Sequence, residues 1–246
     1  MKKQQLASLI DHTLLSPTAA VSDIRQLCRE ARDNGFAAVC VNPIYVQCAA
    51  DELAGSNVKV CTVIGFPLGA LPSECKADEV CRAVAAGADE VDMVISLGDA
   101  CSGNFTAVER DIAAVVRAAR TAGASAAKTI CVKCILETCY LDDAAIVSCC
   151  ECAVRAEADF VKTSTGFATP KDAAGNLLAN GASEHQVALM RKTVGTACGV
   201  KASGGIRTAA AARAMLAAGA NRIGTSSGCA ILASWDELTK IAPWDA

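Results

Sequence analysis

Ala85-Ala86-Gly87-Ala88-Asp89-Glu90-Val91-Asp92 is a stretch that returns later in the chain as Ala217-Ala218-Gly219-Ala220-Asn221-Arg222-Ile223-Gly224. In both copies a helix-forming run ends, a glycine follows, and a short turn leads into a strand. Glycine just after a helix is the usual left-handed cap. Units of helix, short turn and strand are typical of a parallel sheet with helical crossovers.

Eight short strand-like runs can be marked along the chain: Leu9–Leu14, Ala38–Asn42, Val60–Gly65, Val91–Ile95, Ile130–Glu137, Phe160–Thr165, Val200–Ser203 and Arg222–Ser226. Most are continuously apolar, as expected for parallel strands covered on both faces. Helices are predicted between them, including Asp23–Asn34, Glu74–Ala86, Phe105–Ala122 and Arg207–Ala218, each followed by a glycine.

Eight such units in a chain of 246 residues predict an α/β fold, a single (β/α)₈ TIM barrel. We expect an N-terminal extension, a C-terminal helix and one domain over residues 1–246. The alternative is an open doubly wound sheet, although no G-x-G-x-x-G motif follows a strand.

The composition excludes several classes of function. A net charge of -3 argues against nucleic acid as a partner, because a phosphate backbone needs a basic face. No uncharged run reaches the ~20 apolar residues of a membrane span. Asp11 and His12 interrupt any signal-peptide core. We therefore expect a cytoplasmic protein with no membrane partner.

Fifteen cysteines and only two histidines are present. The spacing in Cys131-Val132-Lys133-Cys134 suits a metal site poorly, because residues i and i+3 of a strand point to opposite faces. Cys149 and Cys152 can share a helix face. We interpret the cysteines as small buried hydrophobic residues rather than metal ligands or redox groups, and we expect no metal.

Five ionisable residues stand inside the predicted strands: Asp11, Asp92, Lys133, Lys162 and Lys201. A single buried lysine is readily explained as part of a structural ion pair. Several lysines together disfavour protonation of at least one of them, and a neutral lysine can form a Schiff base with a carbonyl. Lys162 and Lys201 lie on consecutive strands, so one can be the nucleophile and the other its electrostatic perturber.

The loops after the last two strands suit a phosphate group. Gly204-Gly205 precedes the helix that starts near Arg207, and Thr225-Ser226-Ser227-Gly228 precedes the last helix. Backbone N–H groups at glycines and helix N-termini favour anions, and these two loops form the usual phosphate site of such barrels. The alternative is that they are only turn residues.

Two stretches resemble the lysine motifs of the deoxyribose-phosphate aldolase family, Phe160-Val161-Lys162-Thr163-Ser164-Thr165-Gly166-Phe167 and Val200-Lys201-Ala202-Ser203-Gly204-Gly205-Ile206-Arg207. Five further stretches fit the same family: Ile10–Leu15, Val39–Pro43, Glu90–Ile95, Val132–Thr138 and Gly224–Ser227. The resemblance covers nearly the whole chain.

The resemblance implies a class I aldolase that converts 2-deoxy-D-ribose 5-phosphate reversibly to acetaldehyde and D-glyceraldehyde 3-phosphate. Lys162 would form the Schiff base, Lys201 would keep it neutral, and Asp92 would move protons with Lys201 and a water. The implied phosphate ligands are Gly166, Gly204, Gly205, Ser226 and Ser227, and the implied supporting residues are Asp11, Lys133, Thr165 and Cys40. We expect no cofactor, a small phosphorylated sugar as substrate, and a homodimer.

Other functions stay open. The chain can be another lysine-dependent aldolase or a phosphosugar isomerase, or a module that binds phosphate ligands without turnover. The polar connection from Ala168 to Ser183 should lie at the mouth of the site, either as a lid or as an inert insertion. If Cys40 points inward, prolonged exposure to aldehyde should modify it.

Overall fold

The computed structural model describes residues 1–235, which form a closed barrel of eight parallel strands. Neighbours in the barrel are neighbours in the chain, and β1 pairs with β8 to close it. The strands are β1 (Ile10–Leu14), β2 (Ala38–Val41), β3 (Lys59–Ile64), β4 (Glu90–Val94), β5 (Cys131–Ile135), β6 (Phe160–Lys162), β7 (Gly199–Ser203) and β8 (Arg222–Thr225). The predicted (β/α)₈ barrel is confirmed. The prediction of one domain includes residues 236–246, which lie outside the described residues, and it stays a prediction.

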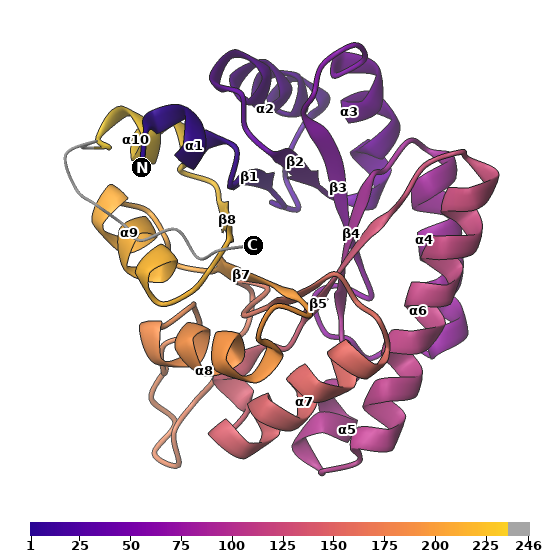
Figure 1. Cartoon of the computed structure of the whole chain (residues 1–246), viewed down its shortest axis with the longest axis vertical. Coiled ribbons are helices and arrows are strands. Elements are labelled where there is room, and N and C mark those ends of the chain that lie inside the picture. The colour runs from indigo at the N-terminus through magenta and orange to yellow at the C-terminus, as the bar shows by residue number, and fades with distance from the viewer. Residues whose placement is uncertain (236–246) are drawn as a thin grey trace.

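Helices surround the barrel on the outside (Figure 1). They are α1 (Lys3–Ala7), α2 (Val21–Asn34), α3 (Val46–Glu52), α4 (Ser73–Ala85), α5 (Leu97–Cys101), α6 (Phe105–Ser125), α7 (Asp143–Arg155), α8 (Glu184–Val194), α9 (Ala209–Ala217) and α10 (Gly228–Ala233), with short 3₁₀ turns at η1 (Pro43–Tyr45) and η2 (Thr138–Tyr140). The predicted N-terminal extension contains α1, and the predicted C-terminal helix is α10.

Apolar residues at helical spacing decide which side of α2 faces the barrel. Ile24, Leu27, Cys28 and Ala31 are buried on it. This i, i+3, i+4, i+7 pattern makes one stripe along a helix. Gly35 ends the helix in the left-handed conformation with φ 67°, as predicted.

The prediction that Gly123 ends a helix is wrong. Helix α6 runs through Gly123 to Ser125, and the left-handed residue that follows is Ala127 with φ 54°. A Cβ on Gly123 would lie 2.6 Å from the carbonyl oxygen of Lys128. This glycine therefore serves close packing against the chain that leads into β5, rather than a cap.

Strand β6 is also shorter than predicted, since it ends at Lys162 rather than at Thr165. Beyond Lys162, side chains take over part of the hydrogen bonding. Thr163 Oγ1 donates to Ser203 O and accepts from Ser203 N, both at 3.0 Å. Thr165 N donates to the Glu137 carboxylate at 3.1 Å. The polar residues after Lys162 thus fix a non-strand backbone at the mouth of the barrel.

Most of the apolar core lies between the strands and the helices. The apolar cluster inside the barrel is small and consists of Leu15, Ala38, Cys40, Cys61 and Val63. Charged side chains occupy much of the remaining interior, which makes the inside of this barrel unusually polar for a buried region.

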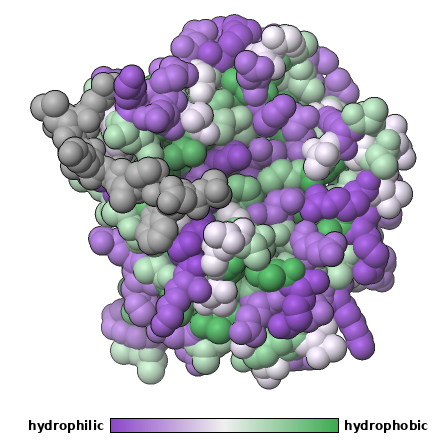
Figure 2. Space-filling view, in the orientation of Figure 1, coloured by the Kyte–Doolittle hydropathy of each residue, from purple (hydrophilic) through white to green (hydrophobic). Residues whose placement is uncertain are grey.

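All fifteen cysteines are free thiols, and eight of them are buried. For those eight, the interpretation as small hydrophobic residues fits their surroundings. Figure 2 shows hydrophilic residues spread over one face of the molecule with smaller apolar patches between them. Among the described residues, none of the helices has the length and apolar character needed to cross a bilayer.

Candidate active site

The five predicted ionisable residues meet inside the barrel. Asp92 on β4 is hydrogen-bonded to Lys201 on β7, a strand three places away, and such a contact is possible only across the interior. The strand register brings the other residues together: Lys162 lies opposite Lys201 on the neighbouring strand, and Asp92 lies opposite Lys133. All five are at least 96% buried: Asp11, Asp92, Lys133, Lys162 and Lys201.

Asp92 is the centre of this group. Its Oδ2 accepts hydrogen bonds from Lys162 Nζ and from Lys201 Nζ, each at 2.7 Å. Its Oδ1 accepts from Lys133 Nζ at 2.8 Å and from Cys61 Sγ at 3.2 Å. One carboxylate therefore accepts hydrogen bonds from three lysines.

Two further charges complete the network, and sequence reasoning missed both. Glu90 lies 2.6 Å from Lys133 Nζ, and Arg222 Nη1 lies 2.7 Å from Asp11. Arg222 also lies 3.3 Å from Glu90. The signal for Glu90 was its two-residue offset from Asp92, which places both on the same face of β4. Arg222 begins its strand and is paired in register with Lys201.

The network sets the charge of Asp92 and of Lys201. Burial acts to raise the pKa of the Asp92 carboxyl, but Lys133, Lys162 and Lys201 hold that pKa well below its usual range. Burial acts to lower the pKa of Lys201, but Asp11 and Asp92 outweigh it and raise that pKa above its ordinary value. Lys201 is thus an ammonium and Asp92 a carboxylate at neutral pH.

Asp11 anchors the far side of Lys201. Its Oδ2 accepts a short hydrogen bond from Lys201 Nζ, and its Oδ1 accepts from Arg222. Burial acts to raise the pKa of Asp11, but Lys201 and Arg222 lower it below the ordinary value. Lys201 is therefore held between two carboxylates.

A cavity of about 310 Å³ opens at the carboxyl ends of the strands. Among the described residues, Lys162 is the only lysine in its lining, and Lys133 and Lys201 are buried outside that lining. Burial alone does not separate the three lysines, because all are at least 96% buried. Access to the cavity does separate them and singles out Lys162.

Four of the five predicted phosphate residues line the same cavity: Gly166, Gly204, Gly205 and Ser226. Ser227 is absent from the lining, and its N–H donates to Thr225 Oγ1 at 2.9 Å. Arg207 also lines the cavity and was not among the predicted residues. A basic residue two positions after a glycine pair was the available signal, since a guanidinium suits a phosphate.

Gly204 and Gly205 need to be glycine for backbone reasons. Both have positive φ, 89° and 78°. An added Cβ on Gly204 would also lie 2.9 Å from the Cα of Gly181. Their N–H groups can therefore face the cavity without side chains in the way.

Thr165 lines the cavity and is held by a buried carboxyl that sequence reasoning missed. Glu137 is 1% exposed, has φ 52°, and accepts hydrogen bonds from both Thr165 N and Thr165 Oγ1. Burial raises the pKa of Glu137. Glu137 thus fixes the loop that follows Lys162.

Cys40 points into the barrel and is fully buried, but it is absent from the cavity lining. It lies opposite Cys61 in the register of β2 and β3. A hydrogen bond with Cys61 lowers the pKa of the Cys40 thiol against the effect of burial. Modification of Cys40 by aldehyde stays a prediction.

The connection from Ala168 to Ser183 reaches the mouth, as predicted. Ala182 N donates to the carbonyl oxygens of Ser203 and Gly204, both at 3.1 Å. Phe167, the residue just before this connection, packs edge-on against Phe66, with ring centroids 5.3 Å apart. This connection therefore supports the loop after β7.

A larger cavity, of about 680 Å³, lies elsewhere. Its lining includes Cys198 and Gly199, at the start of β7, and Asn221, just before β8. These residues belong to the amino ends of the strands, and the lining contains none of the barrel lysines. Size therefore does not identify the reactive site here, because chemistry in such barrels takes place at the carboxyl ends.

Known proteins share both sequence and fold with this chain. Residues 6–234 match the family model for DeoC/LacD family aldolase. A deoxyribose-phosphate aldolase of Geobacillus sp. (strain WCH70) is 52% identical over 230 residues, covering 94% of this chain and 96% of that protein. One of Thermoanaerobacter sp. (strain X514) is 49% identical over 233 residues, covering 95% and 98%.

Solved structures agree. The tetrameric deoxyribose phosphate aldolase from Aeropyrum pernix has a TM-score of 0.83 at 38% identity, covering 97% of this chain and 94% of that one. A putative deoxyribose-phosphate aldolase from Coccidioides immitis has a TM-score of 0.84 at 40% identity, covering 95% and 86%. The chain belongs to the DeoC/LacD family of aldolases.

Proposed function

We propose that this protein is a class I aldolase that cleaves 2-deoxy-D-ribose 5-phosphate reversibly to acetaldehyde and D-glyceraldehyde 3-phosphate. The observation that carries the proposal is the position of Lys162. It is the barrel lysine that lines the cavity, with Asp92 and Lys201 directly behind it. The names of the relatives support the substrate.

Lys162 acts as the nucleophile. The neighbouring Lys201 ammonium favours the neutral form of Lys162, whose Nζ lone pair attacks C1 of the open-chain sugar. The resulting carbinolamine loses water to give a protonated imine. The imine then accepts the electron pair of the C2–C3 bond, so no metal or organic cofactor enters the proposed mechanism.

Asp92 and Lys201 handle the protons. As the C2–C3 bond breaks, the C3 hydroxyl passes its proton through a water to Asp92, which releases glyceraldehyde 3-phosphate and leaves an enamine on Lys162. The same water and Asp92 return the proton to C2 of the enamine, and hydrolysis of the resulting imine frees acetaldehyde. Lys201, whose pKa is raised against burial by Asp11 and Asp92, stays cationic and holds Asp92 in place through these steps.

The phosphate group lies at the glycine loops after β6 and β7 and at Ser226. Arg207 supplies a cation there, which the backbone N–H groups alone do not. A contact of Ser227 with the phosphate stays a prediction, and its N–H would have to leave Thr225 Oγ1 to make it. Thr165, Lys133 and Asp11 act as supporting residues by fixing the groups that touch the substrate.

Trapping with acetaldehyde and borohydride tests the proposal. Reduction of the imine should fix one ethyl group on Lys162, and peptide mapping by mass spectrometry should find it there. The matched control is Lys201→Met, which keeps Lys162 and should still form the adduct, although more slowly. An adduct on Lys133 or Lys201 in the unaltered protein, or no adduct at all, would contradict the assignment.

A substrate panel separates this function from the alternatives. Deoxyribose 5-phosphate should be preferred over ketose phosphates, whereas the reverse would favour another lysine aldolase or an isomerase. Thermal stabilisation by the phosphosugar without product would favour a binding module. The homodimer and the cytoplasmic location stay predictions, and light scattering in solution measures the first of them.

A further inference from the structure

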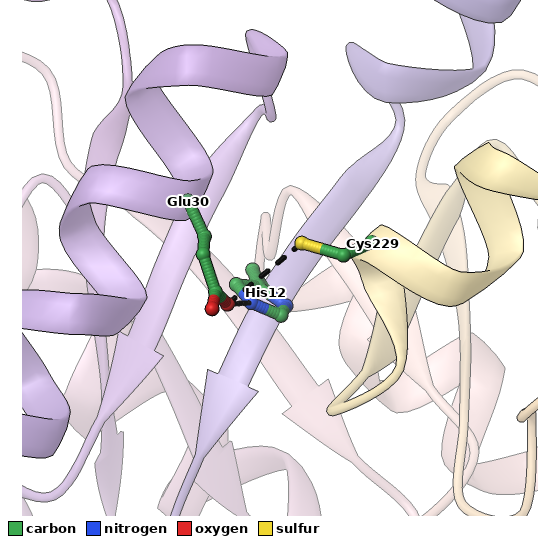
Figure 3. A group of neighbouring side chains, drawn as sticks. All are labelled: His12, Glu30 and Cys229. Carbon is green, nitrogen blue, oxygen red and sulfur yellow. Dashed lines mark hydrogen bonds and ion pairs between the residues drawn. The ribbon is translucent and has the colours of Figure 1, made fainter.

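A second cluster of reactive side chains lies behind β1, on the side away from the cavity. His12 Nε2 lies 2.7 Å from Glu30 Oε2, and Cys229 Sγ lies 3.7 Å from the same oxygen. Figure 3 shows the three side chains pointing toward one another from β1, α2 and α10. Neighbouring residues of β1 thus face opposite ways, with Asp11 toward the active site and His12 toward the helices.

Three groups among the described residues bring at least three possible metal ligands within 4.8 Å of one another. Two of these groups contain Cys61 and lie inside the barrel, where their carboxylates are already paired with cations. Asp92 holds three lysines, and Glu90 is paired with Lys133 and Arg222. A metal ion there would have to displace ammonium or guanidinium groups.

The cluster behind β1 differs in this respect. The described side-chain partners of the Glu30 carboxylate are His12, Gln26 and Cys229, none of which is a lysine or an arginine. A dication can therefore bind here without displacing an ammonium or a guanidinium group.

The ligand set and its spacing suit zinc. Imidazole nitrogen, thiolate sulfur and carboxylate oxygen are the three donor types that Zn²⁺ takes in tetrahedral sites. Bond lengths of about 2.0–2.3 Å place neighbouring ligand atoms about 3.3–3.5 Å apart in that geometry. The Sγ–O separation is 3.7 Å, and the Nε2–O separation of 2.7 Å has to widen by a fraction of an ångström.

We propose that His12, Glu30 and Cys229 bind a divalent transition metal ion of the zinc class, with water as the fourth ligand. A metal ion can reach the site from solvent past Glu30, because the Glu30 side chain is 35% exposed, whereas that of His12 is 4% exposed. Binding releases the thiol proton of Cys229. At Nε2 the ion takes the place of the hydrogen bond to Glu30, so the coordinated imidazole is the neutral tautomer with its single proton on Nδ1.

The site lies at the seam where the barrel closes. β1 pairs with β8, and His12 lies opposite Thr225 in that register. Helix α2 follows β1, and α10 follows β8. An ion held by His12, Glu30 and Cys229 would tie the first βα unit to the last, so we expect it to stabilise the fold rather than take part in the aldol chemistry.

Cobalt titration of the full chain tests the site. The protein is reduced, stripped with a chelator and titrated with Co²⁺, whose sulfur-to-metal charge-transfer absorption appears only when a thiolate is bound. We expect one equivalent to bind with this absorption, and added Zn²⁺ to displace it. Zinc should also raise the melting temperature, because a ligand that binds only the native state stabilises it.

Two variants and one matched control decide the outcome. Cys229→Val and Glu30→Gln should each weaken binding by at least about 10-fold, and Cys229→Val should abolish the charge-transfer absorption and the thermal shift. Cys101→Val removes an exposed thiol elsewhere and should change neither. Circular dichroism of each variant checks folding. Absence of the absorption in the unaltered protein, or its persistence in Cys229→Val, would overturn the proposal.

Discussion

Lys76 and Lys162 are both buried lysines paired with an aspartate, but Lys162 lines the cavity and Lys76 does not. Lys76 on α4 is fully buried in the helical layer, where its Nζ donates to Asp111 at 2.6 Å and to the carbonyl oxygen of Val94 at 2.9 Å. Lys162 is 4% exposed and donates to Asp92 at 2.7 Å. By burial and pairing alone, the two are nearly alike.

The difference lies in what surrounds each pair. Asp111 also accepts from Ser73 Oγ at 2.8 Å and Ser96 N at 3.0 Å, so it connects α4 and α6 to the loop after β4. Asp92 is shared by three lysines, and one of those lysines faces a cavity. A buried ion pair is therefore a poor sign of function by itself. Crowding of like charges and access to a cavity are better signs.

Replacing Lys162 should impair cleavage far more than replacing Lys76, and this is the biggest change that we expect. Lys162→Met should lower kcat for deoxyribose 5-phosphate cleavage by roughly 10⁴-fold or more, because the imine can no longer form. Lys76→Met, assayed at a temperature where it is folded, should keep most of its turnover. If Lys162→Met cleaves the substrate almost as fast as the unaltered enzyme, Lys162 is not the nucleophile.

Stability should rank the two lysines in the opposite order. Lys76→Met leaves Asp111 buried without its cation, so the free energy of unfolding should fall by about 3–5 kcal/mol. Lys162→Met should cost less, because Asp92 keeps Lys133 and Lys201. Urea denaturation measures both. Adding Asp111→Leu to Lys76→Met should restore part of the loss, and a larger loss in Lys162→Met than in Lys76→Met would contradict this ranking.

The cavity that distinguishes Lys162 should be specific for a phosphate group. Arg207→Gln removes a charged hydrogen-bond donor, which is worth about 1.5–3 kcal/mol, so KM for deoxyribose 5-phosphate should rise about 10–100-fold. Turnover of unphosphorylated 2-deoxyribose should be unchanged and provides the internal control. An equal loss with both substrates would mean that Arg207 acts on the structure of the site rather than on phosphate.

The smallest effect is the dependence of stability on pH. The pKa of Asp92 is lowered on folding, since Lys133, Lys162 and Lys201 outweigh burial. Its contribution is therefore present above the unfolded pKa of about 3.9 and is lost as pH falls below that value. The slope is at most about 1.4 kcal/mol per pH unit for this group. Asp92→Asn should flatten the acid limb of the unfolding curve, and an unchanged limb would argue against the pairing.

Much of the fold could be predicted from the sequence. Apolar runs bounded by glycine caps predicted all eight strands to within a few residues, because parallel strands buried on both faces are apolar throughout. The errors occurred where side chains replaced backbone partners, as after Lys162, and where a glycine served packing, as at Gly123. Neither cause leaves a periodic pattern.

Some residues of the candidate site could likewise be identified from the sequence, and others could not. Lys162, Lys201 and Asp92 stood out as charges inside apolar strands. Glu90 and Arg222 did not, because each begins its strand, where a charged residue is ordinary. Lys76 and Asp111 are helical residues whose pairing depends on the packing of α4 against α6.

The barrel, the set of ionisable residues within it and the resemblance to an aldolase family could all be read from the order of the amino acids. These follow from local pattern, since a continuously apolar run and a glycine after a helix are properties of neighbouring residues. The folded barrel was needed to show that Lys162 and Arg207 line the cavity and that His12, Glu30 and Cys229 meet. Closure of the barrel sets which side chains reach the cavity and how far apart strands remote in sequence lie, and no local pattern encodes either.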